Sequence, residues 1–331
     1  MTSQIMTNTR FKTFKRCQRL HFYLYEEGID SADKPLALSF GSGTHTALEY
    51  YWLNHRVMPD IEDLCTSEIG VDDSIKMHAM IHGYDLFWGH DEWETVACEL
   101  EFSLPLKNPD STGKSRTYVL GGKIDAIATH KETGLMWLIE HKTASGDVSE
   151  GSQYWQRLAL DEQISIYLYA AREMGFPVVG CQYDVLRKPS DKIKATPISK
   201  RKYKKDGSLY KNQRSEDESE DEYRARLFEE IGSNPNKYYV RGEVIRLDEE
   251  IEEFMTDLWF QSQMISEYRR RGLHPKNSQA CFDYFRACKF FDLCCKTSNI
   301  EDPRWVRKEK IHNELGDNTN ETERPKTLCV I

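Results

Sequence analysis

Apolar and polar positions repeat with two different periods along this chain, and the period predicts which segments are helices and which are strands. Apolar residues recur at helical spacing in five segments, each of which we expect to form a helix: residues 11–25, 45–55, 73–90, 153–174 and 248–271. Alternating or short apolar runs predict strands at residues 96–106, 178–185 and 238–241. This order of elements predicts an α/β fold, with a central mixed sheet flanked by helices.

Two further apolar runs predict a β-hairpin, formed by residues 121–128 and 135–142 around a turn at residues 131–134. If His130 pairs with Leu135, the same register places Asp125 directly across from Glu140, roughly 5 Å apart at Cβ. Side chains alternate between the two faces of a strand, so Glu140 and Lys142 point the same way. We therefore expect two carboxylates and one ammonium group on a single face of the sheet.

The length of 331 residues is enough for one large domain with insertions. We expect that domain to span residues 1–298, with a polar insertion at 188–236, and a polar tail to follow at 299–331. No apolar run approaches the roughly 18 residues of a membrane span, and the polar, basic start does not read as a secretory signal. We therefore expect a cytoplasmic protein without membrane contact.

The net charge of −9 argues against an indiscriminate DNA coat, but the charge is unevenly distributed. Residues 187–214 are rich in lysine and arginine, and an acidic run at 216–222 follows at once. One interpretation is a solvated loop or helix surface. The other is a strip that tracks the phosphates of a nucleic acid.

The expected set of Asp125, Glu140 and Lys142 suits a divalent cation. Oxygen ligands are preferred by hard cations, and a metal site beside a lysine is typical equipment for phosphodiester hydrolysis. Both carboxylates lie among apolar strand residues, where a charge is costly unless a cation compensates it. The alternative is that both are ordinary exposed residues of a sheet.

Three more residues are weaker candidates. His45 follows a Gly-Ser-Gly sequence that we expect to be a turn, so it would open a helix and could be aimed at a site; a structural histidine is the alternative. Gln163 and Tyr167 lie four residues apart and therefore share one helix face. A partly buried polar pair between helix and sheet would explain them equally well.

Nine cysteines in a chain expected to be cytoplasmic argue against a disulfide framework. Cys281, Cys288 and Cys294 lie in one aromatic segment, with six and five residues between them. Three thiolates leave one ligand missing from a tetrahedral or cubane site, and Cys17 is the best candidate to supply it from the other end of the chain. Ligand count does not separate zinc from an iron–sulfur cluster, and buried cysteines without a ligand are the alternative.

Together these pieces resemble the PD-(D/E)XK nuclease superfamily, and more narrowly its RecB-like and AddB-like branch with an iron–sulfur clasp, which includes phage-type and CRISPR-associated adaptation nucleases. The resemblance covers roughly residues 11–294, and the motifs appear in the family's order. They are Cys17, His45, Glu99, Gly122-Lys123-Ile124-Asp125, Glu140-His141-Lys142-Thr143, Gln163 with Tyr167, and Cys281, Cys288 and Cys294. The long gap between Cys281 and Cys288 departs from many relatives, and Cys295 could replace Cys294.

The resemblance implies a restriction-endonuclease-like core whose two ends are joined by the cysteine cluster. It implies that Asp125, Glu140, His45 and the backbone carbonyl of His141 hold one or two Mg²⁺ or Mn²⁺ ions, with Glu99 as a further acidic position. Lys142 would act on the attacking water and the transition state, while Gln163 and Tyr167 would position the DNA. Cys17, Cys281, Cys288 and Cys294 would hold a [4Fe–4S] cluster, with zinc as the alternative.

The expected activity is that of an exonuclease on single-stranded DNA or duplex ends, in recombination, repair or phage DNA processing. Such a protein would act in the cytoplasm of a bacterium or a phage-infected host. The sequence has no Walker A pattern, so a helicase or recombinase partner would have to supply any unwinding. The alternatives are a non-catalytic nucleic-acid-binding scaffold on the same fold and a CRISPR spacer-processing nuclease; the oligomeric state stays open.

Overall fold

The computed structural model describes most of the chain, namely residues 4–32, 36–61, 69–89, 92–195, 200–210, 213–214, 216–283, 286–312 and 315. Nearly all of the expected polar tail beyond residue 312 lies outside these ranges. Within the described ranges, no helix combines the length and the apolar composition needed to cross a membrane.

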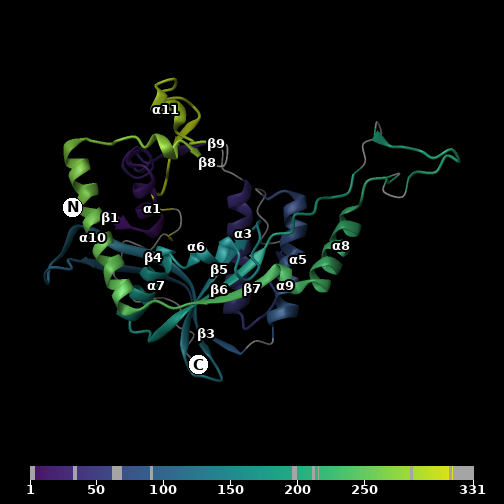
Figure 1. Cartoon of the computed structure of the whole chain (residues 1–331), viewed down its shortest axis with the longest axis horizontal. Coiled ribbons are helices and arrows are strands. Elements are labelled where there is room, and N and C mark those ends of the chain that lie inside the picture. The colour runs from purple at the N-terminus through teal and green to yellow at the C-terminus, as the bar shows by residue number, and fades with distance from the viewer. Residues whose placement is uncertain are drawn as a thin grey trace.

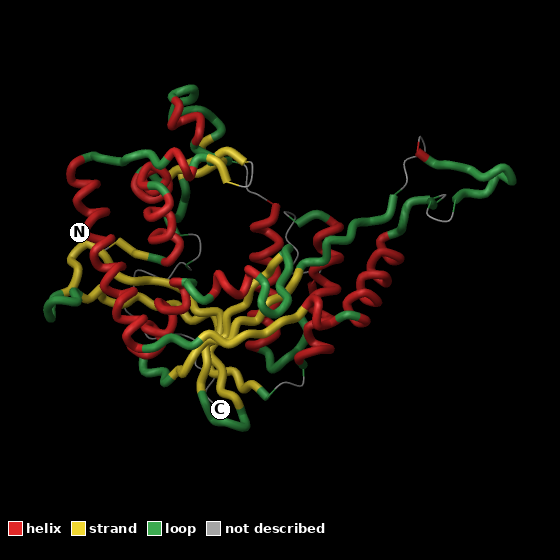
Figure 2. Tube along the Cα trace, in the orientation of Figure 1, coloured by secondary structure: helices red, strands yellow, loops and turns green. Residues whose placement is uncertain are grey.

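A six-stranded mixed sheet forms the centre of the fold (Figure 1, Figure 2). Its path runs β1–β4–β5–β6–β7, and β3 pairs along β4. The pairs β1–β4 and β5–β6 are parallel, and the others are antiparallel. The strands are β1 (Gln4–Met6), β3 (Trp93–Lys107), β4 (Lys114–His130), β5 (Met136–Ala144), β6 (Val178–Arg187) and β7 (Tyr239–Val244).

Helices cover the sheet and bury two separate apolar layers, which confirms the expected α/β architecture (Figure 1). The first layer includes α1 (Asn8–Arg16), α7 (Glu162–Glu173) and α10 (Asp248–Arg271). The second includes α3 (Leu36–Leu53), α5 (Val71–Trp88) and α8 (Glu220–Ser233). The shorter elements are α2 (Gln18–His21), η1 (Phe22–Glu26), β2 (Ile29–Ser31), α6 (Gln153–Leu158), α9 (Pro235–Tyr238), η3 (Ser278–Ala280), β8 (Phe282–Asp283), β9 (Arg286–Ala287), α11 (Phe291–Cys295) and β10 (Trp305–Arg307).

A third, smaller apolar cluster joins segments from the two ends of the chain. Tyr23 and Ile29 pack there with Phe290 and Leu293. The strand β10 pairs antiparallel with β2, although the expected polar tail begins before β10. The N-terminal and C-terminal segments are therefore held together by backbone pairing and by apolar contacts.

The hairpin of β4 and β5 has the register expected from the sequence. His130 N–H donates to Leu135 O at 2.9 Å, and Ala126 pairs with Ile139. The strand β4 is longer than expected, because residues 118–120 also pair with the distant β1.

The expectation of one helix at residues 11–25 is wrong. α1 ends at Arg16, the backbone of Cys17 is extended (φ −165°), and α2 and η1 follow it. The break allows the Sγ atom of Cys17 to accept a hydrogen bond from the backbone N–H of Asn277 at 3.5 Å. Apolar spacing does not reveal a break of one residue, since the pattern resumes on the other side.

The expected turn before His45 is also wrong, because α3 begins at Leu36 and His45 lies inside it. A Cβ atom at Gly43 would lie 3.0 Å from Ile69 Cδ1 and 3.1 Å from Met77 Sδ. The glycine therefore permits close packing of α3 against α5 and does not mark a turn.

The expected helix at residues 153–174 is divided into α6 and α7. Asp161 is the N-cap of α7, and its side chain accepts a hydrogen bond from Gln163 N–H at 3.0 Å. A capped helix start within an apolar pattern explains why spacing alone suggested one continuous helix.

Candidate active site

The site lies at a fork in the sheet. The β4–β5 ladder ends with the pair Ala126–Ile139, while β5 continues alongside β6 through Glu140 and Lys142. At the fork, Asp125 Oδ2 accepts a hydrogen bond from His141 N–H at 2.9 Å. The Asp125 side chain therefore accepts a hydrogen bond from a backbone N–H of β5 at the point where backbone pairing between β4 and β5 stops.

His45 approaches the same carboxylate from α3. Its Nδ1 atom lies 3.5 Å from Asp125 Oδ2. Burial raises the pKa of Asp125, but His45, His141 and Lys142 together lower it to about 2. Burial lowers the pKa of His45, but the hydrogen bond to Asp125 and the charges of Asp125 and Glu140 together leave that pKa raised. Both shifts favour an ionised Asp125.

A row of polar side chains continues from Glu140 toward α7. Lys142 Nζ contacts Glu140 Oε1 and donates to Gln163 Oε1 at 3.1 Å. Gln163 Nε2 then donates to the hydroxyl of Tyr167 at 2.9 Å. The spacing of four residues on α7 thus places Gln163 and Tyr167 in one chain of contacts with Lys142.

Glu140 is 1% exposed, and its Oε2 atom has no hydrogen-bond partner among the described residues. Burial, and then the charge of Asp125, raise its pKa to about 7. A buried carboxylate oxygen without a donor, beside a second carboxylate, is the environment that a hard divalent cation stabilises. Even so, no group of three or more His, Cys, Asp or Glu side chains in the described ranges is already arranged to hold a metal.

Two of the predicted site residues, Glu99 and His141, make their side-chain contacts outside this set of residues. Glu99 lies on β3 between the pairs Cys98–Ala126 and Leu100–Ile124, in a left-handed conformation (φ 48°), and its carboxylate pairs with Lys123. The imidazole of His141 points to the other side of the sheet, with Nδ1 at 3.6 Å from Asp184 Oδ2. Only the backbone of His141 therefore belongs to the site.

Sequence reasoning missed Glu49, which lies one turn after His45 on α3. Burial raises its pKa, Lys123 lowers it and Asp125 raises it, so Glu49 shares the electrostatic environment of the site. Spacing of four residues from His45 is the signal that could have identified it.

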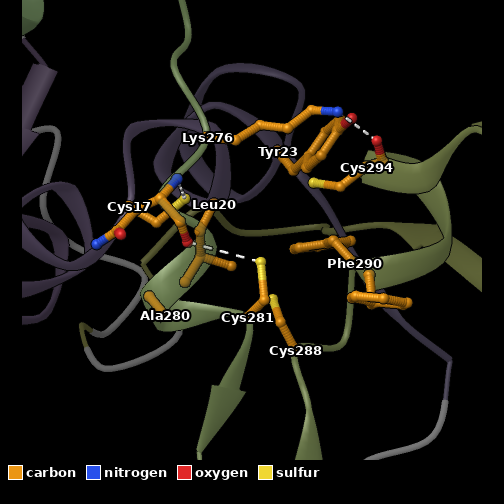
Figure 3. A pocket seen from close by; sticks show the side chains of 11 residues that line it. Cys17, Leu20, Tyr23, Lys276, Ala280, Cys281, Cys288, Phe290 and Cys294 are labelled. Atoms are coloured by element: carbon orange, nitrogen blue, oxygen red, sulfur yellow. Dashed lines mark hydrogen bonds between the residues drawn. The ribbon is translucent and has the colours of Figure 1, made fainter.

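The predicted cysteines from both ends of the chain line one pocket (Figure 3). Cys17, Cys281, Cys288 and Cys294 lie around it with Leu20, Tyr23 and Phe290, and all four cysteines are free thiols. Burial raises the pKa of Cys281, and the neighbouring Cys288 and Cys17 raise it further. Cys295 is exposed and does not line the pocket, so the structure favours Cys294 as the fourth lining thiol.

Gly122 fixes the packing behind the site. A Cβ atom there would lie 2.6 Å from Phe102 Cζ and 3.2 Å from Tyr167 Cε1. We expect Gly122→Ala to lower the free energy of unfolding by about 1–3 kcal/mol, because two packed rings must shift. Urea unfolding measures this loss, and Gly146→Ala is the control, since no atom lies within 4 Å of its added Cβ. Equal stability of the two variants would contradict the prediction.

Fold and site together define an α/β protein with two carboxylates and a lysine at a fork in its sheet. The chain belongs to the PD-(D/E)XK nuclease superfamily, whose family model matches residues 6–294. Proteins of this superfamily generally use divalent metals. The superfamily predicted from the motifs is thereby confirmed, while the RecB-like and AddB-like branch and the iron–sulfur clasp stay predictions.

Solved structures that resemble this chain are distant in sequence. A candidate exonuclease from Eubacterium rectale is 10% identical, with a TM-score of 0.45 and coverage of 90% of each chain. The protein SSO0001 is 13% identical, with a TM-score of 0.31 and coverage of 88% of this chain and 97% of its own. None of the curated proteins compared with this sequence matches it.

Proposed function

We propose that this protein is a metal-dependent deoxyribonuclease that acts as an exonuclease on single-stranded DNA or duplex ends. The observation that carries the proposal is the convergence of Asp125, Glu140 and Lys142 at the fork of the sheet, with one buried Glu140 oxygen unpartnered. In a member of a nuclease superfamily, this donor set is best explained by hydrolysis of phosphodiester bonds.

Asp125, Glu140, His45 and the backbone carbonyl of His141 would hold one or two Mg²⁺ or Mn²⁺ ions. The oxygen-rich set suits both cations, and the single imidazole favours Mn²⁺. A bound ion supplies a more acidic water and offsets charge on the phosphate. Glu49 adds negative charge near this set, whereas the carboxylate of Glu99 pairs with Lys123.

The neighbouring side chains bind and orient the substrate. The Lys142 ammonium group donates to phosphate oxygens as negative charge develops on them, and it helps to orient the attacking water. Gln163 holds Lys142 in place through its side-chain oxygen, and Tyr167 in turn holds Gln163. The amide and the hydroxyl are also suited to position the scissile phosphate.

The pocket lined by Cys17, Cys281, Cys288 and Cys294 supports a second part of the proposal, a [4Fe–4S] cluster with a structural role. Four free thiols with apolar neighbours suit such a cluster, and zinc is the alternative occupant. A bound cluster would join the N-terminal and C-terminal segments covalently through its ligands.

The proposed function predicts cleavage that depends completely on a divalent cation. We expect labelled single-stranded DNA to be degraded with Mg²⁺ or Mn²⁺ and to stay intact with EDTA, because the carboxylates alone do not activate water. Duplexes with blunt and recessed ends, and closed circles, measured in parallel distinguish end cleavage from internal cleavage. Binding without cleavage under every metal condition would instead support the non-catalytic scaffold.

A further inference from the structure

A basic tip, residues 200–210, projects from the body of the protein. The chain leaves β6 after Arg187, extends past α8 and returns to α8, as Figure 1 shows. The tip carries Lys200, Arg201, Lys202, Lys204 and Lys205 but a single acid, Asp206, in a chain whose net charge is −9. Nothing in the catalytic arrangement uses this concentration of positive charge.

The root of the projection is fixed. Glu218 N–H donates to Lys194 O at 2.9 Å, and Lys194 N–H donates to a Glu218 carboxylate oxygen at 2.8 Å. Arg226 donates to both carboxylate oxygens of Glu218, and its guanidinium lowers the pKa of Glu218 to about 2. The hydroxyl of Tyr223 donates to Asp191 O at 2.8 Å. The two legs are therefore anchored on α8.

The tip itself is a small hairpin. Tyr203 and Leu209 form a β-bridge, and Lys204 N–H donates to Ser208 O at 2.7 Å. Gly207 provides the left-handed residue that the turn needs (φ 80°), and Asp206 accepts hydrogen bonds from the backbone N–H and the hydroxyl of Ser208. Such a turn presents Lys204 and Lys205 at the end of the projection.

The acidic run after the projection does not neutralise the tip. Glu220, Asp221 and Glu222 occupy the first turn of α8, where the helix dipole stabilises them, and Ser219 with Glu222 forms a capping box. Among the described residues, no ion pair joins Lys200, Lys202, Lys204 or Lys205 to a carboxylate, and all four are exposed. The acids therefore have a local structural role, and the positive charge at the tip stays available.

Aromatic side chains lie within the same short segment. Tyr203 is 58% exposed and Tyr210 is 50% exposed. Basic residues that contact phosphates, combined with exposed rings on which bases stack, are typical of proteins that bind single strands. If the segment were only a solvated surface, it would need charged residues but would not need exposed aromatic rings.

We propose that the basic tip is a binding site for single-stranded nucleic acid, separate from the cleavage site. The inference rests on the proposed nuclease function for its substrate class. Arg187, where the projection begins, pairs with Ala144, two residues beyond Lys142 in β5. The projection therefore begins beside the strand that carries Lys142, and a long single strand held at the fork is the ligand that the tip would also contact.

The first test measures how binding depends on salt, for the full-length protein and a long single-stranded oligonucleotide in EDTA. The triple variant Lys202→Gln, Lys204→Gln, Lys205→Gln is expected to reduce the slope of log affinity against log salt by about 2, since each phosphate contact on a single strand contributes roughly 0.7. The control neutralises three exposed residues elsewhere: Lys114→Gln, Arg116→Gln and Lys131→Gln. Equal slopes for the two triple variants overturn the proposal.

The second test separates stacking from charge. We expect Tyr203→Ala with Tyr210→Ala to weaken single-strand binding by at least roughly tenfold and to leave duplex binding unchanged, because only unpaired bases offer a face for stacking. Phe260→Ala, which removes an exposed ring on α10, is the control. Unchanged single-strand binding in the tyrosine variant overturns the proposal, whatever the lysine variant does.

The third measurement distinguishes failure of this inference from failure of the proposed function. An oligonucleotide of about six nucleotides, roughly 20 Å long at the spacing within a duplex strand, is the substrate chosen to occupy the fork alone. The triple-lysine variant should cleave it at the wild-type rate and should lose activity on long strands. If the wild-type protein cleaves neither substrate, the nuclease proposal fails, whereas equal activity of variant and wild type on long strands overturns only the role of the tip.

Discussion

Lys142→Ala is expected to lower the rate of metal-dependent DNA cleavage by at least about two orders of magnitude, the effect of removing one donor from a developing oxyanion. Lys142 Nζ contacts Glu140 and lies 3.1 Å from Gln163 Oε1, so it connects the buried carboxylate to the residues of α7. Alanine removes the cation that contacts Glu140, a carboxylate whose pKa the charge of Asp125 already raises. Single-turnover cleavage of end-labelled oligonucleotides, with protein in excess, measures the loss.

The matched control is Lys131→Ala, in the turn of the same hairpin. It removes the same charge from an exposed position and should leave the rate unchanged. Removing one partner of a partly buried ion pair also lowers stability, so both variants are compared at a temperature where circular dichroism shows them folded. Cleavage at the wild-type rate by folded Lys142→Ala protein would contradict the role assigned to Lys142.

The hairpin that carries the site could be predicted because its determinants are local. The alternation of apolar and polar residues determines which face of each strand is buried. The turn between the two strands determines their register. Gly134 provides the left-handed residue of that turn (φ 67°), and its N–H donates to His130 O at 2.8 Å. That register places Asp125 and Glu140 directly after the last pair of the ladder, Ala126–Ile139, and local determinants predict no more than this.

The fork itself could not be predicted, because distant segments create it. The short strand β1 pairs with residues 118–120 of β4, while β6 pairs with the end of β5 and draws it away. His141 N–H is then left for the side chain of Asp125, a contact that no spacing rule anticipates. The positions of His45 and Glu49 likewise depend on the packing of α3 against α5. The sequence indicates that packing only through glycines such as Gly43, which permits the close contact.

The cysteines could be grouped from sequence for a chemical reason. Cys281, Cys288 and Cys294 are too few for a complete thiolate site, which needs a fourth ligand such as Cys17. The structure places Cys17 at the same pocket through the helix break and through backbone contacts such as Arg19 N–H to Pro275 O at 3.0 Å. Number and proximity of thiols do not identify the occupant, because zinc and iron–sulfur clusters use the same ligand atoms.

Cys288→Ala is therefore expected to remove the occupant and to destabilise the protein strongly. Loss of one ligand from a four-cysteine cluster releases its iron, so we expect colourless protein without the broad visible absorption of an iron–sulfur centre, together with poor solubility. Stability should fall because the binding free energy of a structural metal contributes directly to folding. Visible spectra, iron and zinc analysis and thermal unfolding of anaerobically purified protein measure each effect.

Cys295→Ala provides the matched control, since it removes the adjacent but exposed thiol that does not line the pocket. This variant should keep the colour, the iron content and the melting temperature of the wild type. Colourless wild-type protein that contains zinc, and that loses it in Cys288→Ala, would replace the cluster by a zinc site with the same ligands. Brown Cys288→Ala protein would show that these cysteines are assigned wrongly. Brown wild-type protein that turns colourless in Cys288→Ala and also in Cys295→Ala would transfer the fourth ligand from Cys294 to its neighbour.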